Sequence, residues 1–335
     1  MADRSAPPVS RGAVITGWGV ALPDKVVTNV DLEAMLDTSD QWIRERTGIV
    51  ERRIGGTTSG LAIEAGQRAL DQAGCTGADI DLVMVATCSP DQARPSTAST
   101  VQAELGVAGG AMDLNAACSG FVYGLVTAHG LLATGLRRIL LIGSETMSSL
   151  VDWDDRNTAI LFADGAGAVV LEAVDGPGQL LGFDLGSDGT ARHLLYADVG
   201  GYMQMDGREV FRRAVRATVE TVGKTLEQAG LSADDIALAV PHQANVRIVD
   251  SACDKLGIPV ERTANVLDRT GNTSAASIPI ALVDALDHGR VAPGDVVLLV
   301  GFGAGMSWAS ALLRWGGDPT DRPISAPGAA TGSAA

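Results

Sequence analysis

The chain has 335 residues, of which 46% are hydrophobic, and its formal net charge is −15. This composition predicts a packed globular protein, large enough for two domains, and excludes a disordered chain. The acidic balance argues against a nucleic-acid partner, because phosphate binding needs a basic surface. The four cysteines stand singly and without zinc-type spacing, so we expect a reduced, cytoplasmic protein with no metal site.

Apolar strands and helices are predicted to alternate along the chain. The predicted strands are 14–20, 81–87, 111–116, 138–144, 166–172, 178–186, 236–242 and 295–302. A helix from Ser119 to about Thr134 would connect two of them as a crossover. Continuous apolar runs are typical of strands covered by helices on both faces, so the predicted fold class is α/β.

The sequence predicts neither a signal peptide nor a membrane-spanning segment. The N-terminal segment is charged and lacks the apolar core of a signal peptide. The uncharged run 296–313 approaches the length of a membrane span, but glycines interrupt it, so we predict strand, turn and strand in a soluble core. Residues 317–335 are rich in Pro, Gly, Ala and Ser and are predicted to be a disordered tail.

One stretch of sequence occurs twice, at an offset of 156 residues. LDQAGCTGADIDLVMVATCS (70–89) and LEQAGLSADDIALAVPHQAN (226–245) each combine a helix end, a glycine stop, an acidic turn and an apolar run. A repeat this long predicts a duplicated α/β half and not a solenoid. The expected halves are 10–175 and 176–316.

Cys118 is the candidate nucleophile. It follows a predicted strand and opens a predicted helix, which is the geometry of a nucleophile elbow. The helix N-terminus is expected to lower the pKa of the thiol, and small neighbours would let a substrate carbonyl approach. Cys75, Cys88 and Cys253 are expected to be buried and inert.

Two further candidate catalytic residues, a histidine and an asparagine, also lie where a predicted strand or helix is interrupted. His242 ends a predicted strand, where α/β folds position ligands, whereas the other three histidines are expected to be structural or exposed. Asn272 lies in a Gly-Asn-Thr turn, where a capping role is equally open. Together with Cys118 they predict thiol acyl chemistry. Papain-like proteases share the order Cys, His, Asn, but their cysteine-rich signature is absent.

Eight motifs in order make the chain resemble the β-ketoacyl-acyl-carrier-protein synthase III family of thiolase-like ketosynthases, over about residues 12–315. They are DQWIRERTGI (40–49), PDQARPSTAS (90–99), AACSGF (116–121), FADGAGAVVL (162–171), MDGREVF (205–211), PHQANVRI (241–248), GNTSAAS (271–277) and GFGAGMSWAS (301–310). The resemblance implies a five-layer α/β/α/β/α fold of two similar halves, and a homodimer.

The resemblance also implies a mechanism. Cys118 would take an acyl group from an acyl-CoA, with the backbone N–H groups of Cys118 and Ala304 as its oxyanion hole. His242 and Asn272 would hydrogen-bond the thioester carbonyl of malonyl-acyl-carrier protein and stabilise the enolate formed by decarboxylation. No cofactor is implied beyond these substrates.

Further residues are assigned by resemblance alone. The CoA and pantetheine residues would be Trp42, Arg46, Arg156, Gly207 and Asn245, although surface salt bridges are the alternative for the two arginines. The acyl pocket would include Phe211 and, from the partner subunit, Arg94. The surface that docks the acidic carrier protein would include Arg212, Arg213, Arg247 and Lys255, with a solvated helix face as the alternative.

Three departures from the family pattern leave the acyl group open. Arg94 stands where relatives have an aromatic residue, so it either points away or favours a carboxylated acyl group. The segment 197–204 is short for a wall of the acyl tunnel. Ala304 replaces a glycine, which we expect to be tolerated.

Initiation of fatty acid synthesis is the leading hypothesis. The rival is a polyketide-pathway homologue that handles an unusual starter or only transfers acyl groups. Retention of His242 and Asn272 favours condensation over mere acyl transfer. A hydrolase would need a base to activate water, and the sequence offers none beyond His242. The intact set of Cys118, His242 and Asn272 argues against a non-catalytic acyl-binding scaffold.

Overall fold

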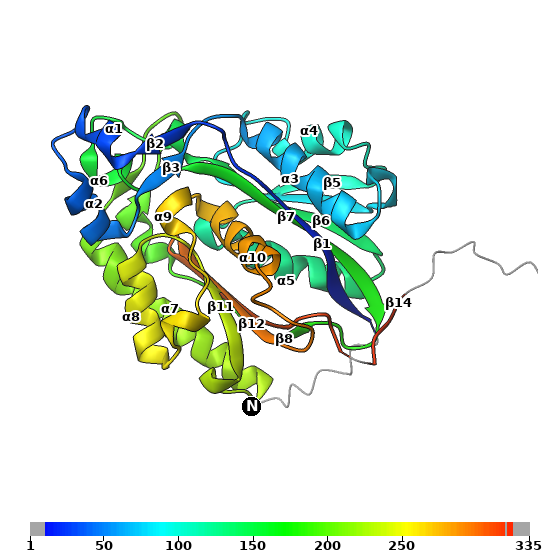
Figure 1. The fold of residues 1–335 in the computed structure, drawn as a ribbon. Helices are drawn as coiled ribbons and strands as arrows, with labels where there is room; N and C mark the ends of the chain where they lie inside the picture. Colours follow the sequence, from blue (N-terminus) through cyan, green and yellow to red (C-terminus); the bar gives the residue numbers. More distant parts are fainter. Residues whose placement is uncertain (1–10, 319, 324–335) are drawn as a thin grey trace, which may run out of the picture.

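The computed structural model describes residues 11–318 and 320–323, and two sheets form its centre (Figure 1). The first sheet has the order β1-β7-β6-β4-β5, with β14 beside β7. Its strands are β1 (Gly12–Ala21), β4 (Leu82–Ala86), β5 (Gly110–Leu114), β6 (Arg138–Thr146), β7 (Asp164–Asp175) and β14 (Arg322–Pro323). The second sheet has the order β11-β12-β13-β8. Its strands are β8 (Leu180–Ser187), β11 (Ile236–Pro241), β12 (Val296–Gly303) and β13 (Ser307–Arg314).

Helices form three layers around the two sheets (Figure 1). Helices α3 (Thr58–Ala73) and α4 (Thr97–Glu104) cover the outer face of the first sheet. Helices α5 (Gly120–Ala133) and α10 (Ser277–Asp287) fill the space between the sheets. Helices α7 (Gly207–Ala229) and α8 (Val246–Leu256) cover the outer face of the second sheet. The predicted five-layer thiolase-like fold is therefore confirmed.

The sequence repeat is also a structural repeat. Helices α3 and α7 each end at a left-handed glycine, Gly74 and Gly230, with φ of 65° and 67°. A capping box follows in each half, from Thr76 and from Ser232, and leads into β4 and β11. Because the same stop and the same cap occur twice, both helices are followed by the same kind of turn into a strand of their sheet.

Shorter elements gather at one end of the molecule (Figure 1). These are β2 (Val26–Thr28), α1 (Asn29–Glu33), α2 (Asp40–Thr47), β3 (Glu51–Arg53) and α6 (Arg156–Ala159). The remaining short elements are α9 (Leu267–Thr270) and the paired strands β9 (Leu195–Tyr196) and β10 (Gln204–Met205).

The predicted strands agree with the observed ones to within about three residues at each end. The run 296–313 forms the antiparallel pair β12 and β13, as predicted. No helix within the described ranges is long and apolar enough to span a membrane. Strand β14 pairs with β7, so the ordered chain continues past 316. The rest of the predicted tail, 324–335, and the first ten residues lie outside the described residues.

Candidate active site

A single cavity of about 1340 Å³ brings the predicted catalytic residues together. Cys118 comes from the first half of the chain, and His242 and Asn272 come from the second, yet all three line this cavity. All three are also buried, with 8%, 8% and 5% of their surface exposed. Chemistry here would therefore take place largely out of water, where hydrogen bonds to a developing charge are strengthened.

Cys118 lies in a tight turn between β5 and α5. A short 3₁₀ helix, Ala117–Ser119, carries it, and Ala117 has a positive φ of 47°. The second half closes over this turn at Gly303, where a methyl group added to the glycine would lie only 2.6 Å from the Cys118 nitrogen. Only glycine permits this approach, so the β12 end holds the nucleophile in place.

Two serines join the nucleophile turn to the first residue of β13 and to the loop that precedes it. The hydroxyls of Ser119 and Ser307 lie 2.8 Å apart, and both donate to the Ala116 carbonyl, at 2.7 and 2.9 Å. Ala304, the predicted oxyanion residue, lies in the same loop and lines the cavity. The two halves are thus tied together directly beside the reactive sulfur.

The expected lowering of the Cys118 pKa is wrong for the resting site. The pKa of this thiol is raised to about 12, mainly by burial and to a smaller extent by the Glu145 carboxylate, while the Ser274 hydroxyl partly offsets both. The cost of placing an anion in an apolar cavity exceeds the help from a helix start, because α5 proper begins two residues later. The resting nucleophile is a neutral thiol.

His242 follows β11 directly, and its backbone N–H donates to the Val300 carbonyl of β12 at 2.8 Å. Its Nδ1 lies 2.6 Å from the Ser277 hydroxyl at the start of α10. Burial lowers the pKa of His242 to about 3, so the ring is neutral at physiological pH. The side chain can serve as a hydrogen-bond donor without adding charge to the cavity.

Asn272 is held by the first half of the chain. Its N–H donates to the Leu161 carbonyl and its own carbonyl accepts from the Ala163 N–H, both at 2.9 Å. Its side-chain Oδ1 accepts from the Ser274 N–H at 2.9 Å. Because the oxygen is engaged, the Nδ2 group is the part of the amide available to donate to a substrate.

The three residues predicted to bind the CoA nucleotide lie together around the Trp42 ring. The guanidinium carbons of Arg46 and Arg156 lie 5.2 and 5.3 Å from the centroid of the Trp42 ring. Trp42 and Arg46 also line the cavity. Arg156 does not line the cavity and pairs with Asp37 at 3.5 Å, which was the alternative considered from sequence.

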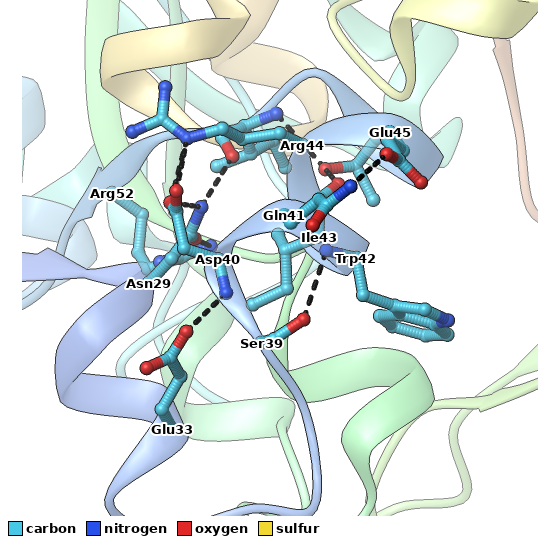
Figure 2. A network of polar contacts seen from close by, with 12 residues as sticks. Asn29, Glu33, Ser39, Asp40, Gln41, Trp42, Ile43, Arg44, Glu45 and Arg52 are labelled. Atoms are coloured by element: carbon cyan, nitrogen blue, oxygen red, sulfur yellow. Dashed lines mark hydrogen bonds and ion pairs between the residues drawn. The ribbon is translucent and has the colours of Figure 1, made fainter.

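A partly buried polar network, not predicted from sequence, holds helix α2, which carries Trp42 (Figure 2). Asn29 accepts from the fully buried Arg52 at 2.9 Å and donates to Asp40, the first residue of α2, at 2.9 Å. Asp40 pairs with Arg44 one turn later, at 2.7 Å. Arg52 sits on β3, so this network fixes the helix that carries Trp42 to the body of the protein.

The predicted pantetheine residues also line the cavity. Gly207 begins α7, and Asn245 caps α8 by accepting from the Arg247 N–H at 2.9 Å. The Asn245 amide donates to the Arg46 carbonyl at 2.9 Å, so its main contact joins α8 to α2. Phe211 lines the cavity as predicted and lies 5.8 Å from the Arg247 guanidinium carbon.

Sequence reasoning missed a second thiol in the cavity. Cys88 lines it, donates to Glu145 at 3.2 Å and lies 3.6 Å from the Ser274 hydroxyl. Cys253 lines the cavity as well, so two of the three cysteines that were expected to be buried and inert lie in the wall of the candidate site. The small residues around Cys118 gave no signal for them, because their proximity depends on the way the strands are ordered in the sheet.

Two of the three departures from the family pattern, Arg94 and the short segment 197–204, concern the acyl pocket, and only the second lies at the cavity of this chain. Arg94 is exposed and does not line this chain's cavity. The short segment 197–204 still contributes Ala197 and Met203 to the cavity wall, and the pairing of Tyr196 with Gln204 joins the two ends of the loop. The flanking residues Leu195, Tyr196 and Met205 also line the cavity.

The four basic residues predicted to dock the carrier protein differ in whether a carboxylate lies beside them. Arg212 pairs with Glu209 at 2.7 Å, and Arg213 pairs with Asp188 at 3.1 Å. Within 11–318 and 320–323, neither Arg247 nor Lys255 has a carboxylate within 4.0 Å, and both are exposed.

The two-sheet fold and the shared cavity define a thiolase-like condensing enzyme. The family models for 3-oxoacyl-[acyl-carrier-protein] synthase III and for its C-terminal region match residues 112–189 and 226–315. The chain is 50% identical over 307 residues to beta-ketoacyl-[acyl-carrier-protein] synthase III 1 of Bacillus anthracis, covering 90% of this chain and 98% of that protein. The chain therefore belongs to the 3-oxoacyl-[acyl-carrier-protein] synthase III family, whose members are acyltransferases.

Solved structures agree with this assignment. The 3-oxoacyl-[acyl-carrier-protein] synthase III from Aquifex aeolicus VF5 superposes with a TM-score of 0.89 at 44% identity, over 91% of this chain and all of that chain. The priming beta-ketosynthase from the R1128 polyketide biosynthetic pathway superposes with a TM-score of 0.87 at 36% identity, over 94% of this chain and all of that chain.

Proposed function

We propose that this protein condenses a short acyl-CoA with malonyl-acyl-carrier protein, releasing CO2 and giving a β-ketoacyl-carrier protein, the first condensation of fatty acid synthesis. The observation that carries the proposal is the convergence of Cys118, His242 and Asn272 on one buried cavity. A nucleophile beside two neutral donors suits both acyl transfer and enolate stabilisation.

In the first half-reaction, Cys118 exchanges one thioester for another. Its sulfur attacks the acyl carbonyl carbon, the bond to the CoA sulfur breaks, and the thiol proton leaves with CoA. Because the pKa of Cys118 is raised, the thiolate develops only as the new bond forms. The backbone N–H groups of Cys118 and Ala304 are the proposed donors to the oxyanion of this step.

In the second half-reaction, the malonyl group loses CO2 and its electron pair forms an enolate. The enolate oxygen would accept from the His242 ring and the Asn272 amide. Its carbon attacks the acyl carbonyl, the bond to Cys118 breaks, and the sulfur takes one proton from water. Removing one such donor typically costs roughly 3–4 kcal/mol of transition-state stabilisation.

The proposed binding sites for the CoA nucleotide and for the carrier protein are formed by residues in and around the cavity. The Trp42 ring, with Arg46 and Arg156 beside it, suits the adenine nucleotide, since stacking and cationic groups both favour it. Arg247 and Lys255 are the proposed main contacts for an acidic carrier protein, because their charge is not neutralised by a neighbour in the described part of the chain.

A homodimer and a cytoplasmic location complete the proposal. Strand β5 is an edge of the first sheet and is mostly half-buried, so a second copy could pair with it. Arg94, exposed on this chain, could then contribute to the partner's acyl pocket. All four cysteines are free thiols, which suits a reducing compartment.

Intact-protein mass spectrometry with a panel of acyl-CoAs, followed by malonyl-carrier protein, tests this function. A short neutral acyl group should add to Cys118 and then leave as a β-ketoacyl product. Transfer without decarboxylation, or a preference for a bulky or carboxylated group, would favour the polyketide-type rival. Loss of the acyl group to water would indicate a hydrolase, and no labelling would indicate a scaffold.

Two variants separate the half-reactions. His242→Ala and Asn272→Ala should each lose condensation by about 100- to 1,000-fold, with acylation of Cys118 reduced far less. Asn157→Ala, which removes another amide that lines the cavity, is the matched control. Equal losses in both half-reactions would contradict the roles given to His242 and Asn272.

A further inference from the structure

The chemistry of His242 depends on which ring nitrogen carries its single proton. The pKa of this ring is lowered to about 3 by burial, so the neutral form has one N–H and one bare nitrogen. Nδ1 faces the Ser277 hydroxyl at 2.6 Å. His242 also lines the cavity, which leaves Nε2 as the nitrogen that can meet a substrate.

Ser277 is restricted in how it can bond. Its oxygen lies 3.2 Å from the Gln243 backbone nitrogen, whose N–H can only donate. In the described part of the chain, His242 Nδ1 is the other partner of this oxygen, and Ser277 is 1% exposed. The hydroxyl proton of Ser277 therefore has one acceptor within reach, which is Nδ1.

Gln243 holds this arrangement in place. Its amide donates to the carbonyls of Pro241 and Ala264, at 2.7 and 3.2 Å, and accepts from the Val266 N–H at 3.0 Å. The side chain is 1% exposed, and both its amide nitrogen and its amide oxygen are hydrogen-bonded. The backbone at 243 is thus pinned between β11 and the segment before α9, with its N–H directed at Ser277.

We propose that Ser277 is a positioning residue that fixes the tautomer of His242, by donating its hydroxyl proton to Nδ1 and so keeping the ring proton on Nε2. The inference rests on the proposed role of His242 as a donor to the substrate carbonyl. It makes His242 a poor general base in the resting enzyme, because its cavity-facing nitrogen is already protonated. This agrees with an acylation step in which the thiol proton leaves with CoA.

Nitrogen-15 NMR of the histidine-labelled protein tests the tautomer without any substrate. The His242 signals are assigned by their loss in His242→Asn. We expect a protonated Nε2 and a bare Nδ1 in the unmodified protein, and a mixture of tautomers in Ser277→Ala. A protonated Nδ1 in the unmodified protein would overturn the proposal, whether or not the enzyme condenses its proposed substrates.

Kinetics give a second readout. In Ser277→Ala, kcat of condensation should fall about ten- to a hundredfold, less than on outright loss of a donor, with KM for malonyl-carrier protein nearly unchanged. Ser277→Thr, which keeps a hydroxyl, should recover most of this loss. Ser187→Ala, which alters a cavity serine elsewhere, is the matched control. Condensation by Ser277→Ala at the unmodified rate would contradict the proposal.

Discussion

The Cys118 thiol should react slowly with small alkylating reagents, although it is the proposed nucleophile. Burial raises its pKa to about 12, three units above the ordinary value of 9.0. The thiolate fraction near pH 8 should therefore be about a thousandfold below that of a free thiol. Because the thiolate is the reactive form, the rate should rise about tenfold per pH unit from pH 7 to 10, without a plateau.

Ser274→Ala is the perturbation that tests this reasoning. The Ser274 hydroxyl favours the thiolate, so its removal should raise the pKa of Cys118 further. A hydrogen bond to a charged group contributes about 1.5–3 kcal/mol, so alkylation should slow by roughly ten- to a hundredfold at each pH. Ser187→Ala is the control, since Ser187 lines the cavity but is not among the groups that shift the pKa of Cys118.

The assay is the rate of iodoacetamide labelling at Cys118, followed by peptide mass spectrometry. A Cys88→Ser background removes the second cavity thiol from the signal. A plateau with its midpoint below pH 8 would refute the account, because the helix start would then outweigh burial. Faster labelling in Ser274→Ala would refute the role given to the hydroxyl.

Three further predictions concern the nucleophile turn, the CoA end and the docking surface. Gly303→Ala should slow acylation of Cys118 and lower the free energy of unfolding by about 1–3 kcal/mol, because the added methyl group overpacks the turn. A methyl group added at Gly223 would have no atom within 4 Å, so Gly223→Ala should be neutral or stabilising in the same unfolding assay. Trp42→Ala should raise KM for acyl-CoA roughly 2- to 30-fold and spare KM for malonyl-carrier protein; equal effects on both would contradict the adenine site. Charge reversal at Arg247 should raise KM for malonyl-carrier protein more than reversal at the internally paired Arg212, and equal effects would show that this pairing does not matter.

The fold could be predicted from sequence because its signals are local. Strand β11 and the glycine that ends the helix before it, Gly230, repeat strand β4 and Gly74. Each of these features depends only on neighbouring residues. The glycines within 296–313 likewise distinguish two strands from a membrane helix without reference to the rest of the chain.

The candidate site was predictable only in part. Cys118, His242 and Asn272 stand at breaks between elements, so their sequence positions indicated them, and the structure places all three at one cavity. The protonation of Cys118 was predicted wrongly, because the helix start is a local feature, whereas burial and the Glu145 carboxylate arise from distant segments.

The sequence by itself determined the family, the order of the strands and helices, and the candidate catalytic residues. Only the tertiary structure decided the state of each group: the neutral Cys118, the contact of His242 with Ser277, and the second thiol at Cys88. The physical reason is that element formation follows from periodicity and capping along a few residues. A pKa or a tautomer follows from solvent exclusion and hydrogen-bond partners that lie far away in the chain.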